Sequence, residues 1–383
     1  MIRETISKMS TNKVATKGLE DIVAASSSIC FIDGKEGRLI YRGYDIKDLA
    51  EHSSFEETVY LLWFGNLPTV NELKEFSNRL MANRNLPEIV NQLIHSSKNA
   101  EPSDVLRTSV SALQLHDADS TNNAYEANLR KATRLVSQTA TIIAQHERIR
   151  KGLQPIEPSA SMKHASNFLY MLTGKEPSER DQEIFDVCLI LHADHELNAS
   201  TFVARSTVST LSDMHSAVTS AVGTLKGPLH GGANIGVMKM LHNIPDPSGS
   251  ESYVRKALEE KKKIMGFGHR VYRTEDPRAT ILRKFSEELG KKSGDTRWYE
   301  TTRRVEEAVK KEKGLYPNVD LYSASVYHYL GISQELFTPI FALSRIGGWT
   351  AHILEQYSDN RLIRPVAQYT GPKERRYAPA DKR

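Results

Sequence analysis

Apolar side chains recur with the period of an α-helix along most of this chain, and the segments with strand character lie before residue 47. Residues 212–227 repeat small apolar side chains at helical spacing, and the Gly-Pro pair that follows must break the helix. In residues 181–196 the apolar positions i, i+3, i+4 and i+7 of one helix face are Ile184, Val187, Cys188 and Leu191. A mainly α-helical fold is therefore predicted.

Residues 28–46 differ from the rest of the chain. Two short runs with strand character flank Asp33-Gly34, a dipeptide that favours a hairpin turn. We therefore expect a small N-terminal β-hairpin or sheet. Residues 232–325 carry more charge than their surroundings. They are predicted to form a small domain inserted into a large helical domain, which comprises residues 1–231 and 326–383.

The composition excludes several classes of protein. Hydrophobic residues make up 39% and charged residues 26%, which is typical of a globular chain rather than a disordered one. The net charge of +4 is small and the basic residues are scattered, so nucleic-acid binding gains no support. No apolar run is long enough to cross a bilayer. The first sixteen residues, expected to be a flexible arm, lack the apolar core of a secretion signal.

Cysteine is rare in this chain. Cys30 and Cys188 are far apart and lie in apolar surroundings, which is typical of buried, reduced thiols. Together with the composition, this predicts a soluble cytoplasmic protein that binds neither nucleic acid nor membranes.

His192 and His195 are three residues apart in a segment predicted to be helical, and two histidines at this spacing can bind a metal ion. A third and a fourth ligand at suitable spacing are missing, and there is no His-Glu-x-x-His motif. Packed or hydrogen-bonded histidines are the simpler interpretation. No metal site is predicted.

Three further segments place a reactive side chain beside glycine or proline. His230 lies between Gly227-Pro228 and two glycines, which permit a tight turn and the close approach of a ligand. His269 follows a Gly-x-Gly sequence and precedes three arginines, whose guanidinium groups can bind carboxylates with two hydrogen bonds. Asp320 follows a Pro-Asn turn, where aspartate is often a cap. Taken singly, each segment also fits an ordinary loop, a solvated helix face or a turn.

Together, and in this order, these segments resemble the citrate synthase family in its short archaeal and bacterial form. The matching motifs are KGPLHGGA around His230, MGFGHRVY and DPRA around His269, YPNVD ending at Asp320, FALSR ending at Arg345, and RLIRP containing Arg364. The resemblance begins at residue 17 and covers nearly the whole chain. It implies a two-domain, mainly helical fold with a small N-terminal sheet.

The resemblance also implies a Claisen condensation of acetyl-CoA with oxaloacetate, followed by hydrolysis of the thioester. Asp320 matches the base that removes a proton from the thioester methyl group, and His230 matches the hydrogen-bond donor to the thioester oxygen. His269 matches the residue that protonates or polarises the ketone of oxaloacetate.

Further positions match residues of the family that bind the substrates. Residues expected to bind oxaloacetate are His195, Arg278, Arg345 and Arg364. Residues expected to contact coenzyme A are Lys263, Ile264, Met265, Gly266, Gly268, Lys313 and Asn318. The family match also implies a homodimer in which Arg364 reaches the site of the partner subunit. No permanently bound cofactor is expected, because histidines and arginines supply the charge stabilisation.

Two alternatives remain open at this point. Some segments also resemble 2-methylcitrate synthases, which accept propionyl-CoA, and a single methylene group discriminates by only about 1–3 kcal/mol. The chain is thus predicted to be a citrate synthase, with a 2-methylcitrate synthase or an enzyme with both activities as the alternative. The second alternative is a helical scaffold without catalytic activity, although a scaffold has no chemical need for this set of side chains.

Overall fold

The structure is a computed structural model that describes residues 16–19 and 22–383, so the predicted N-terminal arm lies almost wholly outside the described residues. The chain divides into two units. One unit comprises Met1–Ser26 with Leu362–Arg383, and its described part contains two short 3₁₀ helices, η1 (Lys17–Leu19) and η5 (Ala380–Lys382). The other unit, Ser27–Arg361, is called the body below.

The body confirms the mainly α-helical prediction. Its strands are β1 (Cys30–Asp33), β2 (Arg38–Tyr41) and β3 (Tyr44–Asp45). The helices that begin before residue 200 are α1 (Ile46–His52), α2 (Phe55–Phe64), α3 (Val70–Ala82), α4 (Glu88–Ser96), α5 (Pro102–Leu113), α6 (Tyr125–Arg150), α7 (His164–Thr173), α8 (Glu179–His192) and α9 (Ala199–Val208). The later helices are α10 (Met214–Leu225), α11 (Ala233–His242), α12 (Ser250–Glu259), α13 (Pro277–Ser293), α14 (Arg297–Lys313), α15 (Val319–Tyr329) and α16 (Phe337–Ser358). Short 3₁₀ helices are η2 (Gln114–His116), η3 (Pro247–Gly249) and η4 (Gln334–Leu336).

Capping residues set the ends of several helices. The Ser54 side chain caps α2 by accepting a hydrogen bond from Glu57 N, and Gly65 ends this helix in the left-handed conformation, with φ of 87°. Asp213 caps α10 in the same way. The small apolar face of α10 is buried against α5, α9 and α16, so its small residues allow close packing between helices of one chain.

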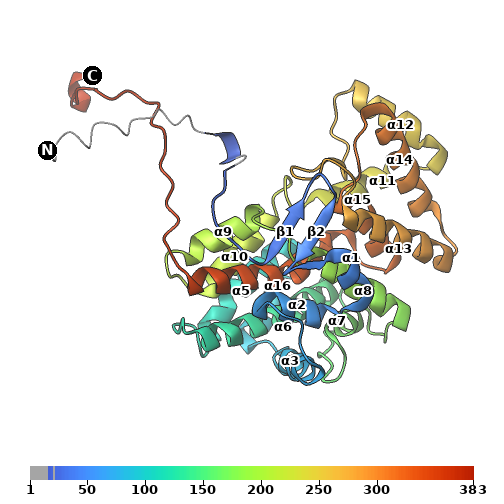
Figure 1. Ribbon diagram of the computed structural model, residues 1–383, viewed down its shortest axis with the longest axis horizontal. Helices are drawn as coiled ribbons and strands as arrows, with labels where there is room; N and C mark the ends of the chain where they lie inside the picture. The colour runs from blue at the N-terminus through green and yellow to red at the C-terminus, as the bar shows by residue number, and fades with distance from the viewer. Residues whose placement is uncertain (1–15, 20–21) are drawn as a thin grey trace. The chain divides into compact units, whose positions relative to one another are not determined.

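Helix α16 is the centre of the body (Figure 1). It packs against α2, α6, α8, α9 and α10, and nearly all of its side chains are buried. A helix that is apolar around most of its circumference is stable only inside a protein. Cys30 and Cys188 are also buried and free, as predicted.

The predicted hairpin is present and is extended to three antiparallel strands in the order β1-β2-β3. Asp33 pairs with Arg38 at the end of the hairpin, and the Asp33 carboxylate accepts hydrogen bonds from the backbone N–H groups of Lys35 and Glu36. Residues 34–37, called the β1–β2 turn below, connect the two strands.

Helices α11 to α15 pack mainly against one another, and Figure 1 shows them grouped together. The contacts of this group with the rest of the body include those of α13 with α1 and α8 and those of α11 with α16. This packing agrees with the region of higher charge, 232–325, but the domain boundary stays a prediction.

Candidate active site

His195 lies in a loop that follows α8, because this helix ends at His192. The prediction that both histidines share one helix is therefore wrong. The backbone of the loop is held by α16: Arg345 Nε donates to His192 O at 2.7 Å, and Gly348 N donates to Ala193 O at 3.1 Å. These tertiary hydrogen bonds replace the next turn of the helix.

The close approach of α16 to this loop requires a glycine. A Cβ atom at Gly348 would lie 2.3 Å from Ala193 O and 2.4 Å from Asp194 Oδ1. Strand β2 also holds this loop, because the hydroxyl of its Tyr41 donates to Asp194 O at 2.7 Å and accepts from Asp194 N at 3.1 Å. Strand β2 and helix α16 together fix the backbone that carries His195.

His195, His269 and Tyr272 form an aromatic cluster. The His195 ring centroid lies 5.0 Å from that of His269 and 5.7 Å from that of Tyr272, while the His269 and Tyr272 rings are 4.6 Å apart. His195 Nε2 and the Tyr272 hydroxyl are buried without a hydrogen-bond partner. Burial and the charge of Arg278 hold the pKa of His195 well below its usual value, so this ring is neutral.

The hydrogen bonds of His269 define its tautomer. Its Nδ1 accepts from Val271 N at 3.0 Å and from Tyr272 N at 3.2 Å, so the proton of the neutral ring is on Nε2. Burial and the charge of Arg278 lower the pKa of His269 to about 4. The ring can therefore donate one hydrogen bond from Nε2 at neutral pH.

A clamp between two loops brings His269 near α15. Asn318 N donates to Gly266 O at 3.0 Å, and Asn318 Nδ2 donates to Gly268 O at 3.0 Å. Gly266 and Gly268 both have positive φ, which favours glycine. A side chain at Gly266 would also meet Leu321 at 2.9 Å.

Asp320 lies in the first turn of α15, with its backbone N–H bound to the capping Asn318 side chain. Burial raises the pKa of its carboxyl to about 7, against the lowering effects of Arg278, Arg345 and Lys263. Its Oδ1 is buried without a hydrogen-bond partner. This carboxyl can therefore gain and lose a proton near neutral pH.

Two buried arginines supply positive charge. Arg278, at the start of α13, is held by two hydrogen bonds from Nε and Nη2 to the Asp276 carboxylate, at 2.9 and 2.7 Å. Arg345 lies over the Phe341 ring, 4.8 Å from its centroid, and its Nη2 is buried without a partner. Both charges act on His195 and on Asp320, which places the four groups in one electrostatic environment.

His230 lies in the loop between α10 and α11. Its Nε2 is 2.8 Å from Ser200 Oγ, which accepts a hydrogen bond from Trp349 Nε1 at 3.1 Å and donates one to Asn198 Oδ1 at 2.8 Å. The ring is 6.4 Å from that of Phe341, so it faces the same side of α16 as Arg345. Burial and the charge of Arg345 lower the pKa of His230 to about 4, and the ring is neutral.

The other predicted residues are those expected to contact coenzyme A, and Arg364. The ammonium charge of Lys263 acts on Asp320, and Met265 would contact any side chain at Gly236. Ile264 is buried and lies in the segment that connects α12 to α13, and Lys313 is the last residue of α14. Arg364 is exposed and belongs to the unit with Leu362–Arg383, so its predicted place in the site stays a prediction.

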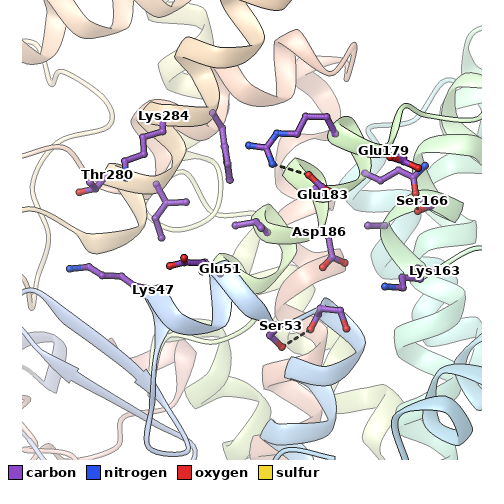
Figure 2. Close-up of a pocket in the computed structure, with 18 of the residues that line it drawn as sticks. Lys47, Glu51, Ser53, Lys163, Ser166, Glu179, Glu183, Asp186, Thr280 and Lys284 are labelled. Atoms are coloured by element: carbon purple, nitrogen blue, oxygen red, sulfur yellow. Dashed lines mark hydrogen bonds and ion pairs between the residues drawn. The ribbon is translucent and has the colours of Figure 1, made fainter. Parts of the chain in front are cut away.

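A pocket of about 1050 Å³ lies apart from these residues (Figure 2). It is lined by α1, the start of α7, α8 and α13, and Asp186 projects toward it between Glu51 and Lys163. None of the residues predicted for the site lines this pocket. The pocket is therefore not part of the candidate active site.

Two other features, a metal-binding group and a helix able to span a membrane, are absent from the described residues. Residues 16–19 and 22–383 contain no group of three or more His, Cys, Asp or Glu side chains that could hold a metal ion. Within the same residues, no helix is both long and apolar enough to span a membrane.

Sequence reasoning missed Tyr272, Ser200 and Asp276 as parts of the site. Tyr272 and Asp276 stand within the motifs around His269, so they were visible there but had no assigned role. Ser200 is thirty positions before His230, and only the packing of α9 on the loop brings them together. No local pattern marks such a contact.

The body is thus mainly α-helical, and its candidate site contains three neutral histidines, two arginines and one carboxyl of raised pKa. Residues 18–366 match the family described as citrate synthase, C-terminal domain. The chain is 53% identical to "Citrate synthase 2" of Bacillus subtilis, over 96% of this chain and 99% of that protein. It is 41% identical to the 2-methylcitrate synthase of Shewanella oneidensis, over 96% and 98%.

A solved structure is also similar. Citrate synthase from Thermoplasma acidophilum, solved as a ternary complex with carboxymethyl coenzyme A and oxaloacetate, superposes with a TM-score of 0.90 at 34% identity, covering 96% of this chain and 99% of that one. The chain belongs to the citrate synthase family, which is a family of acyltransferases.

Proposed function

We propose that the chain condenses acetyl-CoA with oxaloacetate and hydrolyses the product to citrate and CoA. One observation carries this proposal: four buried polar atoms without a partner belong to groups that share one electrostatic environment. They are His195 Nε2, Tyr272 Oη, Asp320 Oδ1 and Arg345 Nη2. Unpaired buried polar atoms cost about 1–3 kcal/mol each, so a polar ligand that pairs with them is expected.

In the first step, Asp320 removes a proton from the methyl group of the thioester. A base works best when its pKa is close to the operating pH, and the Asp320 pKa of about 7 meets this condition. His230 donates a hydrogen bond to the thioester oxygen as a neutral ring. The Ser200 hydroxyl donates its one proton to Asn198 Oδ1 at 2.8 Å. When it rotates to donate to His230 Nε2, at the same distance, it assists the step, because the ring proton is then on Nδ1.

In the second step, the enol carbon attacks the ketone of oxaloacetate. The Nε2–H of His269 polarises this ketone, and His195 pairs with the same substrate. Arg278 and Arg345 bind its carboxylates, and Arg364 completes the set from the partner subunit of a homodimer. Asp276 keeps the Arg278 guanidinium oriented before the substrate arrives.

The acyl-CoA binds along residues 263–268, with Lys313 and Asn318 as further contacts. Residues 232–325 close as a small domain over the large one, and the base is assembled after oxaloacetate binds. No metal or permanently bound cofactor takes part, and the enzyme acts in the cytoplasm. The ternary complex of the Thermoplasma acidophilum relative supports the choice of both substrates.

The choice between acetyl-CoA and propionyl-CoA needs a direct measurement. The higher identity to relatives named citrate synthase favours acetyl-CoA, and a dual specificity costs little physically. The test is the ratio of kcat/KM for the two thioesters with oxaloacetate, followed through CoA thiol release. A ratio above one supports citrate synthase, and a ratio below one supports 2-methylcitrate synthase. Absence of thiol release with both thioesters would leave only the scaffold alternative.

A further inference from the structure

The β1–β2 turn is in direct contact with the loop that follows His269. Arg273 N donates a hydrogen bond to Gly34 O at 2.8 Å, across 239 positions of sequence. A Cβ atom at Gly34 would lie 2.1 Å from Val271 O, and one at Gly37 would lie 2.8 Å from Thr274 Cγ2. Real Cβ atoms do not approach other atoms so closely, so only glycine allows this contact at position 34.

The backbone held by the β1–β2 turn is the same backbone that sets the tautomer of His269. The Val271 carbonyl packs against Gly34, where a Cβ atom would displace it, and the Val271 N–H donates to His269 Nδ1. Tyr272 follows, donating its N–H to the same nitrogen at 3.2 Å. Arg273 is then fixed through its own N–H. The contacts form an unbroken path from the turn to the imidazole ring.

We propose that the β1–β2 turn is a positioning element for His269. By holding residues 271–273, it keeps two backbone N–H groups on Nδ1 and so leaves the proton of the neutral ring on Nε2. A loop free to move would lose one or both hydrogen bonds, and the ring could then carry its proton on either nitrogen. The catalytic consequence of the tautomer rests on the proposed function, whereas the tautomer itself does not.

The substitution Gly34→Ala tests the proposal, because the added methyl group must displace Val271 O. A displacement of about 1 Å can lower a rate about 100-fold, so we expect a fall in kcat of this order and a higher KM for oxaloacetate. Lys35→Ala is the matched control within the turn, since its side chain is exposed. Gly249→Ala is a control for the added methyl group, because nothing lies within 4 Å of it. Both controls should keep wild-type kinetics.

The direct readout is the ¹⁵N NMR spectrum of histidine-labelled protein, with the His269 signals assigned by their loss in His269→Asn. In the wild type, Nε2 is expected to carry the proton, and in Gly34→Ala the two nitrogens are expected to share it. Unchanged His269 signals and unchanged kcat in a folded Gly34→Ala variant would overturn the proposal. If the wild-type chain releases no CoA, the proposed function fails, but the NMR comparison still decides the role of the turn.

A second variant tests the proposal independently if Gly34→Ala fails to fold. Replacing residues 34–37 by Asn-Gly keeps the pairing of Asp33 with Arg38 through a two-residue turn, and it removes the docked residues. The same change in the His269 signals is expected. Retention of the wild-type tautomer in this variant would also contradict the proposal.

Discussion

The burial of Asp320, the proposed base, has a cost in stability. Its carboxyl has a pKa of about 7 in the folded chain, against a usual value of 3.8. The contribution of the protonated carboxyl to stability is complete below pH 3.8 and is lost as the pH rises through 7. Above pH 7 the buried carboxylate lowers the free energy of unfolding by at most about 4 kcal/mol.

Asp320→Asn should therefore abolish CoA release while making the free protein more stable. The difference in free energy of unfolding between variant and wild type should grow from pH 4 to pH 7 and then level off, which urea titrations at several pH values can measure. In the wild type, kcat/KM should fall as the pH drops below about 7. Retained turnover in the variant would remove Asp320 from the role of base.

Tyr272 is predicted to bind oxaloacetate through its hydroxyl. The residue is 4% exposed, and the hydroxyl is buried without a hydrogen-bond partner in the described chain. Tyr272→Phe keeps the ring against His195 and His269 but removes this donor. A hydrogen bond worth about 1.4 kcal/mol corresponds to a tenfold change, so KM for oxaloacetate should rise about tenfold. Tyr44→Phe, at a partly exposed ring, is the control. An unchanged KM in Tyr272→Phe would show that the hydroxyl does not contact the substrate.

At the scale of elements, local patterns predicted the helices but not the end of α8. Ser54 and Gly65 mark the ends of α2 in the sequence, because caps act through neighbouring backbone groups. Nothing local ends α8, and the stop comes from Arg345 and Gly348 of α16, about 150 positions later. The hairpin was likewise predictable from Asp33-Gly34, whereas its docking on residues 271–274 was not.

Gly348 should be essential for the junction of α8 with α16. Gly348→Ala places a methyl group 2.3 Å from Ala193 O, and overpacking of this kind costs about 1–3 kcal/mol or more. We expect a lower melting temperature and weaker oxaloacetate binding, because the loop that carries His195 must move. Gly249→Ala should leave both unchanged. A Gly348→Ala variant with wild-type stability would mean that the loop can shift without cost.

At the scale of the whole molecule, motifs in a fixed order predicted the members of the candidate site, while its geometry required the folded chain. The motifs carry His230, His269 and Asp320 because the chemistry constrains the residue types. The raised pKa of Asp320 and the tautomer of His269 depend on burial and on backbone contacts between distant segments. Such contacts leave no periodic signal in a single sequence.

The assignment of Arg364 to a partner's site is a prediction about the assembly. If each site takes Arg364 from the other subunit, one site of a mixed dimer of Arg364→Ala and Asp320→Asn chains receives both defects and the other site receives none. Random association makes half of the dimers mixed, so co-expression of two inactive variants should restore about one quarter of the wild-type activity per site. CoA release by the unfractionated co-expressed protein measures this, and dimers purified through both of two different tags, which are all mixed, should show about one half of the wild-type activity per site. If Arg364 serves its own chain, each site of the mixed dimer has one defect and no activity returns.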